Sequence, residues 1–289
     1  MSDLFAGITQ GILYALVALS LVIIWRSTNV LNFAQGAMAM FATYVGMTQI
    51  DRGVGFWWCL LISVAVGLVF GGVTERVLIR PLYGKPEINP IVVMVGFLGL
   101  LEALAQAIWT STPRNIPSPF SQVYFLVDGH RVLLNPYLIF QLVLATGIML
   151  GIAALFRFTK LGLQLRAAAT APEVARLLGV RVNRMLTLGW ILASGIGSLT
   201  AVVVASQGSN LVPTLMDGFF VSGFIAAALG GLDSPVGAVV GGLSLGIATE
   251  FVRSYWSENA AQLVPLLILI LVLMLRPQGL FSRDALRRV

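Results

Sequence analysis

The stretch LFAGITQGILYALVALSLVIIW, residues 4–25, carries no charged side chain from its first residue to its last. An α-helix of about 20 mostly apolar residues crosses the hydrocarbon core of a bilayer. Eight more apolar runs follow along the chain, at 33–50, 56–74, 90–110, 136–156, 185–206, 218–229, 236–252 and 261–275. Since the run at 218–229 is too short to span alone, we expect about eight transmembrane helices, with eight to nine crossings.

The composition indicates the same fold class. The chain of 289 residues is 58% hydrophobic and 10% charged, and its mean hydropathy is +0.92. Soluble domains carry roughly a quarter charged residues, and a water-soluble fold of this size could not hide so much apolar surface. We expect a single all-α transmembrane domain over residues 1–289, surrounded by the lipid bilayer.

The positive charges are gathered in three segments. Most of the 18 lysines and arginines lie between residues 76 and 85, between 157 and 184, and in the tail from 276. Cytoplasmic loops of membrane proteins carry such an excess of basic residues. We therefore expect the three segments and the C-terminus on the cytoplasmic side, and no nucleic-acid partner despite the net charge of +6.

Two polar segments interrupt the apolar pattern, at 29–36 and at 230–235. Irregular backbone at membrane depth occurs where it lines a cavity or is buried in protein. An ordinary short turn is the alternative for the second segment. The candidates for a translocation pathway are therefore Asn32, Gln35, Gly36, Gly230, Gly231 and Asp233.

Glu102 is a further pathway candidate, because it lies inside the apolar run at 90–110. A carboxylate at this depth costs at least about 2.5 kcal/mol on insertion scales, so it should face the interior of the bundle. It either contacts the solute or is structural, paired with a Ser, Thr or Arg.

The basic loop at 157–184 contains the signals of a short helix. Pro172 suits a first helical turn, Glu173 suits the positive end of the helix, and Gly179 suits its stop. Three apolar side chains share one face of this helix, namely Val174, Leu177 and Leu178. Such a face needs a partner protein or, alternatively, anionic lipid.

Features of an enzyme are missing. His130 is the single histidine and Cys59 the single cysteine, so neither a second histidine nor a cysteine cluster is available for a metal site. Neither lysine stands in a Gly-Lys-Ser/Thr phosphate loop, because Lys85 precedes Pro86 and Lys160 precedes Leu161. We expect no catalytic residue, metal or cofactor, and we expect a partner to hydrolyse any ATP.

Glycines four residues apart indicate close helix packing. Such pairs are Gly67/Gly71, Gly147/Gly151, Gly237/Gly241 and Gly242/Gly246. The stretch at 67–77 also resembles the stretch at 242–252, and on this threading the two cross the membrane in opposite directions. This pattern is either an inverted repeat or a chance similarity in a chain rich in Gly and Leu.

Four ordered motifs carry a family resemblance between about residues 11 and 281. They are Asn-Phe-Ala-Gln-Gly at 32–36, the loop with Arg166, Ala175 and Gly179, the glycines from Gly230 to Gly242, and Arg-Pro-Gln-Gly-Leu-Phe at 276–281. With them the chain resembles the permease family of branched-chain amino acid ABC importers. Gln35, Ala37 and Asp233 depart from the usual family residues.

The resemblance implies a permease subunit in a bacterial inner membrane. It implies import of hydrophobic amino acids or of related small solutes, with urea and short amides as alternatives. The implied partners are cytoplasmic ATP-binding-cassette ATPases, a second permease in a heterodimer, and an external solute-binding protein docking near the loop at 111–135. The ATPases would contact the coupling helix through Arg166, Pro172, Glu173, Ala175, Arg176 and Gly179.

Three other classes remain as alternatives. A stand-alone secondary carrier or channel would more often bury several ionisable groups, and Glu102 is the only acidic residue well inside a run. A membrane enzyme would need a nucleophile with a base, or a metal. A purely structural scaffold would not need the two irregular segments.

Overall fold

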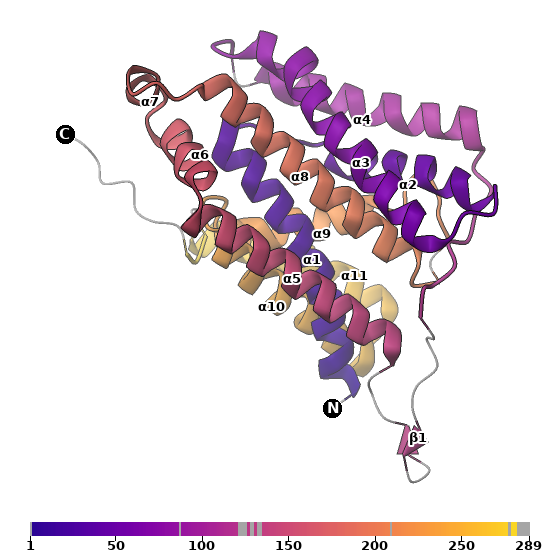
Figure 1. Cartoon of the computed structure of the whole chain (residues 1–289). Helices are drawn as coiled ribbons and strands as arrows, with labels where there is room; N and C mark the ends of the chain where they lie inside the picture. The colour runs from indigo at the N-terminus through magenta and orange to yellow at the C-terminus, as the bar shows by residue number, and fades with distance from the viewer. Residues whose placement is uncertain are drawn as a thin grey trace.

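The computed structural model describes residues 2–86, 88–120, 126–127, 130–131, 135–208, 210–276 and 279–281. This part of the chain forms eleven α-helices and one small hairpin (Figure 1). The helices are α1 (Ser2–Thr28), α2 (Gln35–Ile50), α3 (Phe56–Thr74), α4 (Ile88–Trp109), α5 (Pro136–Phe158), α6 (Lys160–Thr170), α7 (Pro172–Leu177), α8 (Val182–Ala205), α9 (Asp217–Gly230), α10 (Pro235–Tyr255) and α11 (Glu258–Leu275). A π-helical turn, η1 (Glu75–Ile79), and a 3-10 turn, η2 (Arg80–Leu82), follow α3.

The all-α transmembrane prediction is confirmed, and each of the nine apolar runs forms a helix. Seven helices are long and apolar enough to cross a membrane: α1, α3 with its following turns, α4, α5, α8, α10 and α11. The other two, α2 with 16 residues and α9 with 14, are shorter. The only strands among the described residues are β1 (Leu126–Val127) and β2 (His130–Arg131), which pair antiparallel between α4 and α5.

Glycines bring three pairs of helices into close contact, as predicted: α1 with α10, α3 with α8 and, through Gly237 and Gly241, α9 with α10. At Gly246 an added Cβ would overlap Gly11, so α10 lies directly against α1. At Gly67 it would overlap Ser198, so α3 lies directly against α8. Gly147 and Gly151 on α5 do not pack closely against another described helix of this chain, because an added Cβ there would meet open space.

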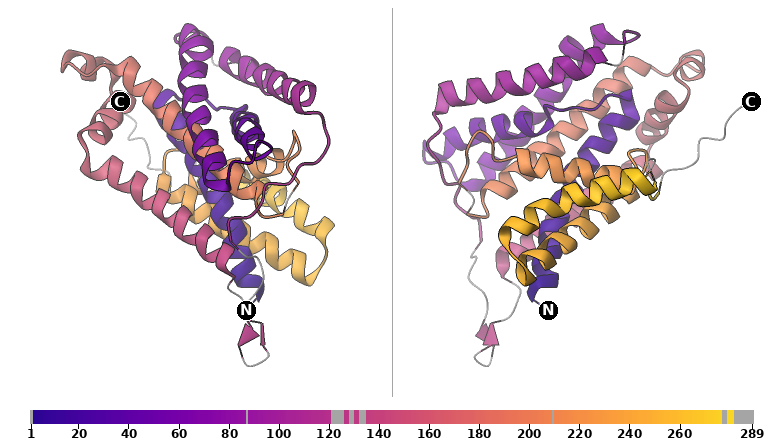
Figure 2. Two further views of the ribbon diagram at one scale, coloured as in Figure 1. Left: turned by 45° about the vertical axis from the view of Figure 1, so that its right-hand side comes forward. Right: turned by 180° about the vertical axis from the view of Figure 1, so that it is seen from behind.

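The helices run between two ends of the bundle. One end, called here the α7 end, holds α6, α7, the η1–η2 connection and the α9–α10 turn (Figures 1 and 2). The N-terminus, the α2–α3 turn and the hairpin lie at the other end, called here the hairpin end. The basic segments at 76–85 and 157–184 thus share one end, since Arg80 on η2 bonds to the first turns of α8. Arg283, Arg287 and Arg288 lie outside the described residues.

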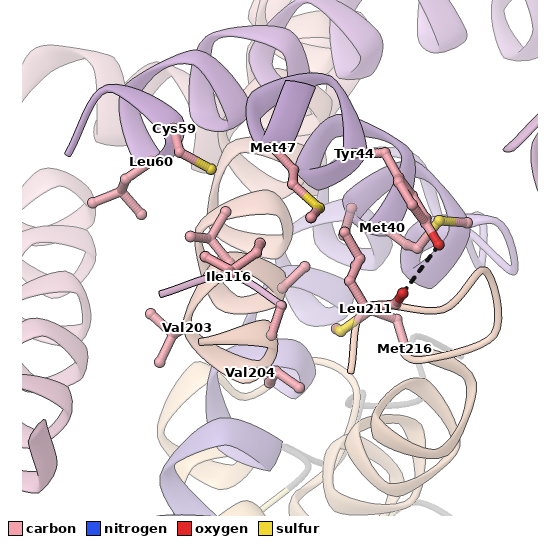
Figure 3. Packing of buried hydrophobic residues seen from close by; sticks show 14 of the residues in the cluster. Met40, Tyr44, Met47, Cys59, Leu60, Ile116, Val203, Val204, Leu211 and Met216 are labelled. Carbon is pink, nitrogen blue, oxygen red and sulfur yellow. Dashed lines mark hydrogen bonds between the residues drawn. The ribbon is translucent and has the colours of Figure 1, made fainter. Parts of the chain in front are cut away.

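A buried apolar cluster fixes α2 and the segment that precedes α9 (Figure 3). Met40, Tyr44 and Met47 of α2 pack there with Leu211 and Met216. The Tyr44 hydroxyl donates to the Leu211 carbonyl at 3.3 Å. This cluster holds the chain segment that enters α9 close to α2.

Candidate functional site

The predicted break at 29–36 is confirmed. Helix α1 ends at Thr28, and α2 begins at Gln35. Asn29 has a positive φ of 53°, which ends the helical path. The Gln35 amide donates to the carbonyl of Ala193, close to the middle of α8, at 3.0 Å. Helix α2 therefore starts about halfway along the bundle rather than at its end.

Asn32 and Gln35 form a buried polar cluster at this start. Their side chains are 1% and 2% exposed. Asn32 donates from Nδ2 to Oε1 of Gln35 at 2.9 Å, and its own Oδ1 accepts from the amide of Ala34 at 3.1 Å. Since an unpaired polar group at this depth is costly, the internal hydrogen bonds are what permit the break.

A second interrupted helix meets the first. The chain leaves α8 at the hairpin end and returns inward to begin α9 at Asp217 (Figure 2). An added Cβ at Gly36 would lie 3.3 Å from the Met216 carbonyl and from Cβ of Phe220. Gly36 thus permits close contact between the starts of α2 and α9. The returning segment is anchored by Arg114, whose backbone exchanges hydrogen bonds with Leu211.

Gly230, Gly231 and Asp233 form a tight turn at the α7 end. Gly231 has φ +95°, a conformation that favours glycine, and Ser234 caps α10 by accepting from the Gly237 amide. The amides of Leu280 and Phe281 donate to carbonyls of this turn region. Gly230 lies about 20 Å along α9 from the helix start. The structure therefore does not bring this turn together with Asn32, Gln35 and Gly36.

Glu102 is half-buried on α4, beside another acidic residue. Its carboxyl group lies close to that of Asp217, the first residue of α9. Among the described residues no Ser, Thr or Arg bonds to Glu102, and the choice between a structural role and contact with the solute stays a prediction. This contact places Glu102 beside the junction of the two interrupted helices.

Sequence reasoning missed a buried ionic cluster at the α7 end. Glu75 has no exposed side-chain surface, and it accepts from Arg80 at 2.9 and 3.2 Å. The hydroxyls of Tyr83 and Thr187 also donate to Glu75, at 3.1 and 2.8 Å. Positions five apart point about 140° away from each other on an α-helix, so this pair could not be predicted from the spacing of the two residues. The π-helical turn η1 removes that separation.

The predicted short helix forms as α7, and its start and stop are as expected. Pro172 is its first residue, and Gly179 follows it with φ +81°. Ala175 is buried, in a cluster with residues of α6 and α8, whereas Glu173 and Arg176 are exposed. Arg166 is exposed on α6. The apolar face points away from the bundle: Val174, Leu177 and Leu178 are 54%, 88% and 78% exposed.

The external loop is held to the bundle near its beginning. Arg114 forms an ion pair with Asp51 in the α2–α3 turn, at 2.9 Å. Residues 121–125, 128–129 and 132–134 of the predicted docking loop lie outside the described residues. In the part of the chain that the structure describes, no three metal-ligating side chains come together.

Comparison with known proteins decides the family. Residues 4–273 match the family described as "Branched-chain amino acid transport system / permease component". The chain belongs to this family. It is therefore a multi-pass membrane permease, the transmembrane component of a transport system, and not itself an enzyme.

Relatives match this permease over its full length. It is 28% identical to the high-affinity branched-chain amino acid transport system permease protein BraD of Pseudomonas aeruginosa, covering 100% of this chain and 98% of the relative. It is also 28% identical to LivH of Escherichia coli, a protein with the same description, covering 100% and 97%. Among solved structures, PsaBC from Streptococcus pneumoniae in complex with Fab shares the fold, with TM-score 0.54, 14% identity, and coverage of 96% and 91%.

Proposed function

We propose that this permease forms the membrane pathway of an ATP-driven importer of branched-chain amino acids. Its full-length relatives BraD and LivH carry that solute in their descriptions. On this proposal the α7 end is cytoplasmic, the C-terminus lies inside a bacterial inner membrane, and an external solute-binding protein docks at the hairpin end. A second, related permease completes the pathway, and urea or short amides are the alternative solutes.

The observation that carries the ATPase proposal is the exposed apolar face of α7. Leu177 and Leu178 are mostly exposed and so contribute little to the packing of the fold, and α7 lies at the end of the bundle (Figure 1). Neighbouring exposed leucines on a short helix outside the bundle, as on α7, are typical of a docking contact. An ATPase subunit covering them would move α7, and α8 would transmit that movement because it follows α7 after a short turn.

The pathway proposal rests on the junction of α2 and α9. Asn32, Gln35, Gly36 and Glu102 lie around two helix starts inside the bundle, as in transporters built on interrupted helices. Gly230, Gly231 and Asp233 would then act at the inner mouth of the pathway, since their turn lies at the α7 end.

The test is a docking variant, Leu177→Ser with Leu178→Ser. Because both side chains are exposed, membrane insertion and thermal stability should stay unchanged. Recovery of an ATPase subunit on affinity purification and uptake of labelled leucine should both fall at least ten-fold. Leu280→Ser is the matched control, since Leu280 is also an exposed leucine at the α7 end. Normal uptake in the double variant would overturn the ATPase proposal.

A second variant distinguishes docking on a protein from contact with lipid. Exchanging the charges of Glu173 and Arg176, as Glu173→Arg with Arg176→Glu, leaves the net charge and the apolar face unchanged. A protein interface depends on the position of each charge, so we expect uncoupled ATP hydrolysis. Unchanged coupling would favour α7 as an interfacial helix on anionic lipid.

A further inference from the structure

A cavity of about 530 Å³ lies between α1, α9, α10 and α11. It is in the half of the bundle toward the hairpin end, because α10 lines it with Thr249 and Arg253 near its last turn. Val221 and Leu266 line the cavity and are also exposed, so it opens to the surface of the chain. The volume lies within the roughly 300–1,000 Å³ that small-molecule sites occupy.

The wall of the cavity is mostly apolar, with one buried hydroxyl that has no partner. Tyr14, Leu215 and Phe219 provide apolar surface. Ser222 lines the same cavity and is only 7% exposed. Among the described residues its hydroxyl has no hydrogen-bond partner. The Ser222 hydroxyl is not one of the fully buried atoms that lack a partner, so it is accessible from the cavity and available to a ligand group there.

A backbone acceptor adds to this wall. Pro265 lies inside α11 and has no N–H group. The carbonyl of Ala261, four residues earlier, therefore lacks its usual helical donor. Both residues line the cavity. The cavity thus has hydrogen-bond acceptors on two of its walls, at Ser222 on α9 and at Ala261 on α11.

The charges around the cavity sum to a negative value. Arg253 lines it, but it is already bound by Glu250 and Glu258. Asp217 also lines the cavity. With the two partners of Arg253, which lie beside the cavity and not in its wall, there are three acids against one base. A proton on Asp217 would still leave an excess negative charge. The start of α9 contributes only about half a positive charge, so the excess remains negative.

We propose that this cavity binds the ammonium group and aliphatic body of a branched-chain amino acid on its way through the permease. Asp217, the Ser222 hydroxyl and the Ala261 carbonyl accept hydrogen bonds from the ammonium group, and Tyr14, Phe219 and Leu266 contact the aliphatic body. The inference rests on the proposed import of such solutes. It adds that recognition in this chain is of the amine and not of the carboxylate.

Three probes test the inference on the purified full-length permease with its copurifying subunits in lipid nanodiscs. Leucine carries both charged groups, 3-methylbutylamine carries only the ammonium, and 4-methyl-2-oxopentanoate carries only the carboxylate. Leucine and the amine should raise the midpoint of thermal unfolding, whereas the oxo acid should not. Ser222→Ala should weaken binding of the amine about five-fold, and Asp217→Asn at least ten-fold.

Ser244→Ala is the control, because Ser244 is exposed on α10 and does not line the cavity. Binding of the oxo acid but not the amine would overturn the inference, as would an amine affinity unchanged by Ser222→Ala. Binding of none of the three probes would also overturn it and leave lipid as the occupant. Leucine uptake is measured separately in cells with and without the wild-type permease. This measurement tests the import proposal independently of the binding inference.

Discussion

The ionic cluster around Glu75 leads to an asymmetric prediction: Arg80→Ala should destabilise the permease more than Glu75→Ala. The Glu75 side chain has no exposed surface, whereas the Arg80 side chain is 28% exposed. Removing Arg80 leaves a fully buried carboxylate without its cation. Removing Glu75 leaves a guanidinium that can turn toward water at the end of the bundle.

The magnitudes follow from the contacts. Leaving one member of a buried pair without its partner costs about 3–5 kcal/mol. After Arg80→Ala, Tyr83 and Thr187 still donate to Glu75, so we expect about 3 kcal/mol. After Glu75→Ala we expect about 1–2 kcal/mol. The double variant should lose about 2 kcal/mol, less than Arg80→Ala alone, because it contains no buried unpaired charge.

The assay is thermal unfolding of the four purified proteins in one detergent, read by loss of the monodisperse peak. One kcal/mol corresponds to roughly 2–4 °C for a chain of this size, so Arg80→Ala should unfold about 6–12 °C below the wild type. The double variant should recover part of that loss. If Glu75→Ala is the less stable single variant, or if the two effects simply add, the reasoning is refuted.

Three further predictions concern neighbouring contacts. Tyr83→Phe removes one donor to Glu75 and should cost about 1–2 kcal/mol in the same assay; burial and the adjacent Glu75 raise the pKa of Tyr83 above its usual range, so this loss should not change between pH 6 and pH 9. Gly246→Leu should prevent α10 from contacting α1 and abolish the monodisperse peak, whereas Gly147→Leu, which enters open space, should leave it intact. Gln35→Leu removes the bond to the Ala193 carbonyl and should cost about 1–3 kcal/mol, and an unchanged unfolding temperature would show that this bond does not hold the start of α2.

Much of the fold could be predicted because the lipid bilayer imposes a simple relation between sequence and structure. Every helix that crosses a bilayer needs an apolar run, and the runs at 56–74 and 136–156 match α3 and α5 almost residue by residue. Polar residues inside such a run are rare enough to be informative, so Asn32 and Gln35 marked the break before α2. Pro172 and Gly179 likewise marked α7, because their backbone preferences are local.

The start of α9 could not be predicted in the same way. The segment from 206 to 216 contains Gln207, Gly208, Asn210 and Pro213, and it resembles an ordinary external loop. What turns it back into the bundle is tertiary: the Tyr44 hydroxyl and the backbone of Arg114 both bond to Leu211. The closeness of Asp217 to Glu102 was therefore not predicted.

The order of the helices explains why the two interrupted helices meet. Helices α1, α2 and α3 correspond in order to α8, α9 and α10, with α2 and α9 as the short members. The third helix of each set packs against the first helix of the other set: α3 lies against α8, and α10 lies against α1.

The similar stretches at 67–77 and 242–252 run in opposite directions along the bundle, since α3 ends and α10 begins at the α7 end. The set α1–α3 and the set α8–α10 cross the membrane in opposite directions. If the second helix of each set is interrupted at the corresponding place, both of these helices start near the middle of the membrane. The starts of α2 and α9 then face each other, and an inverted repeat accounts for Gly36 contacting Met216 and Phe220 better than chance similarity does.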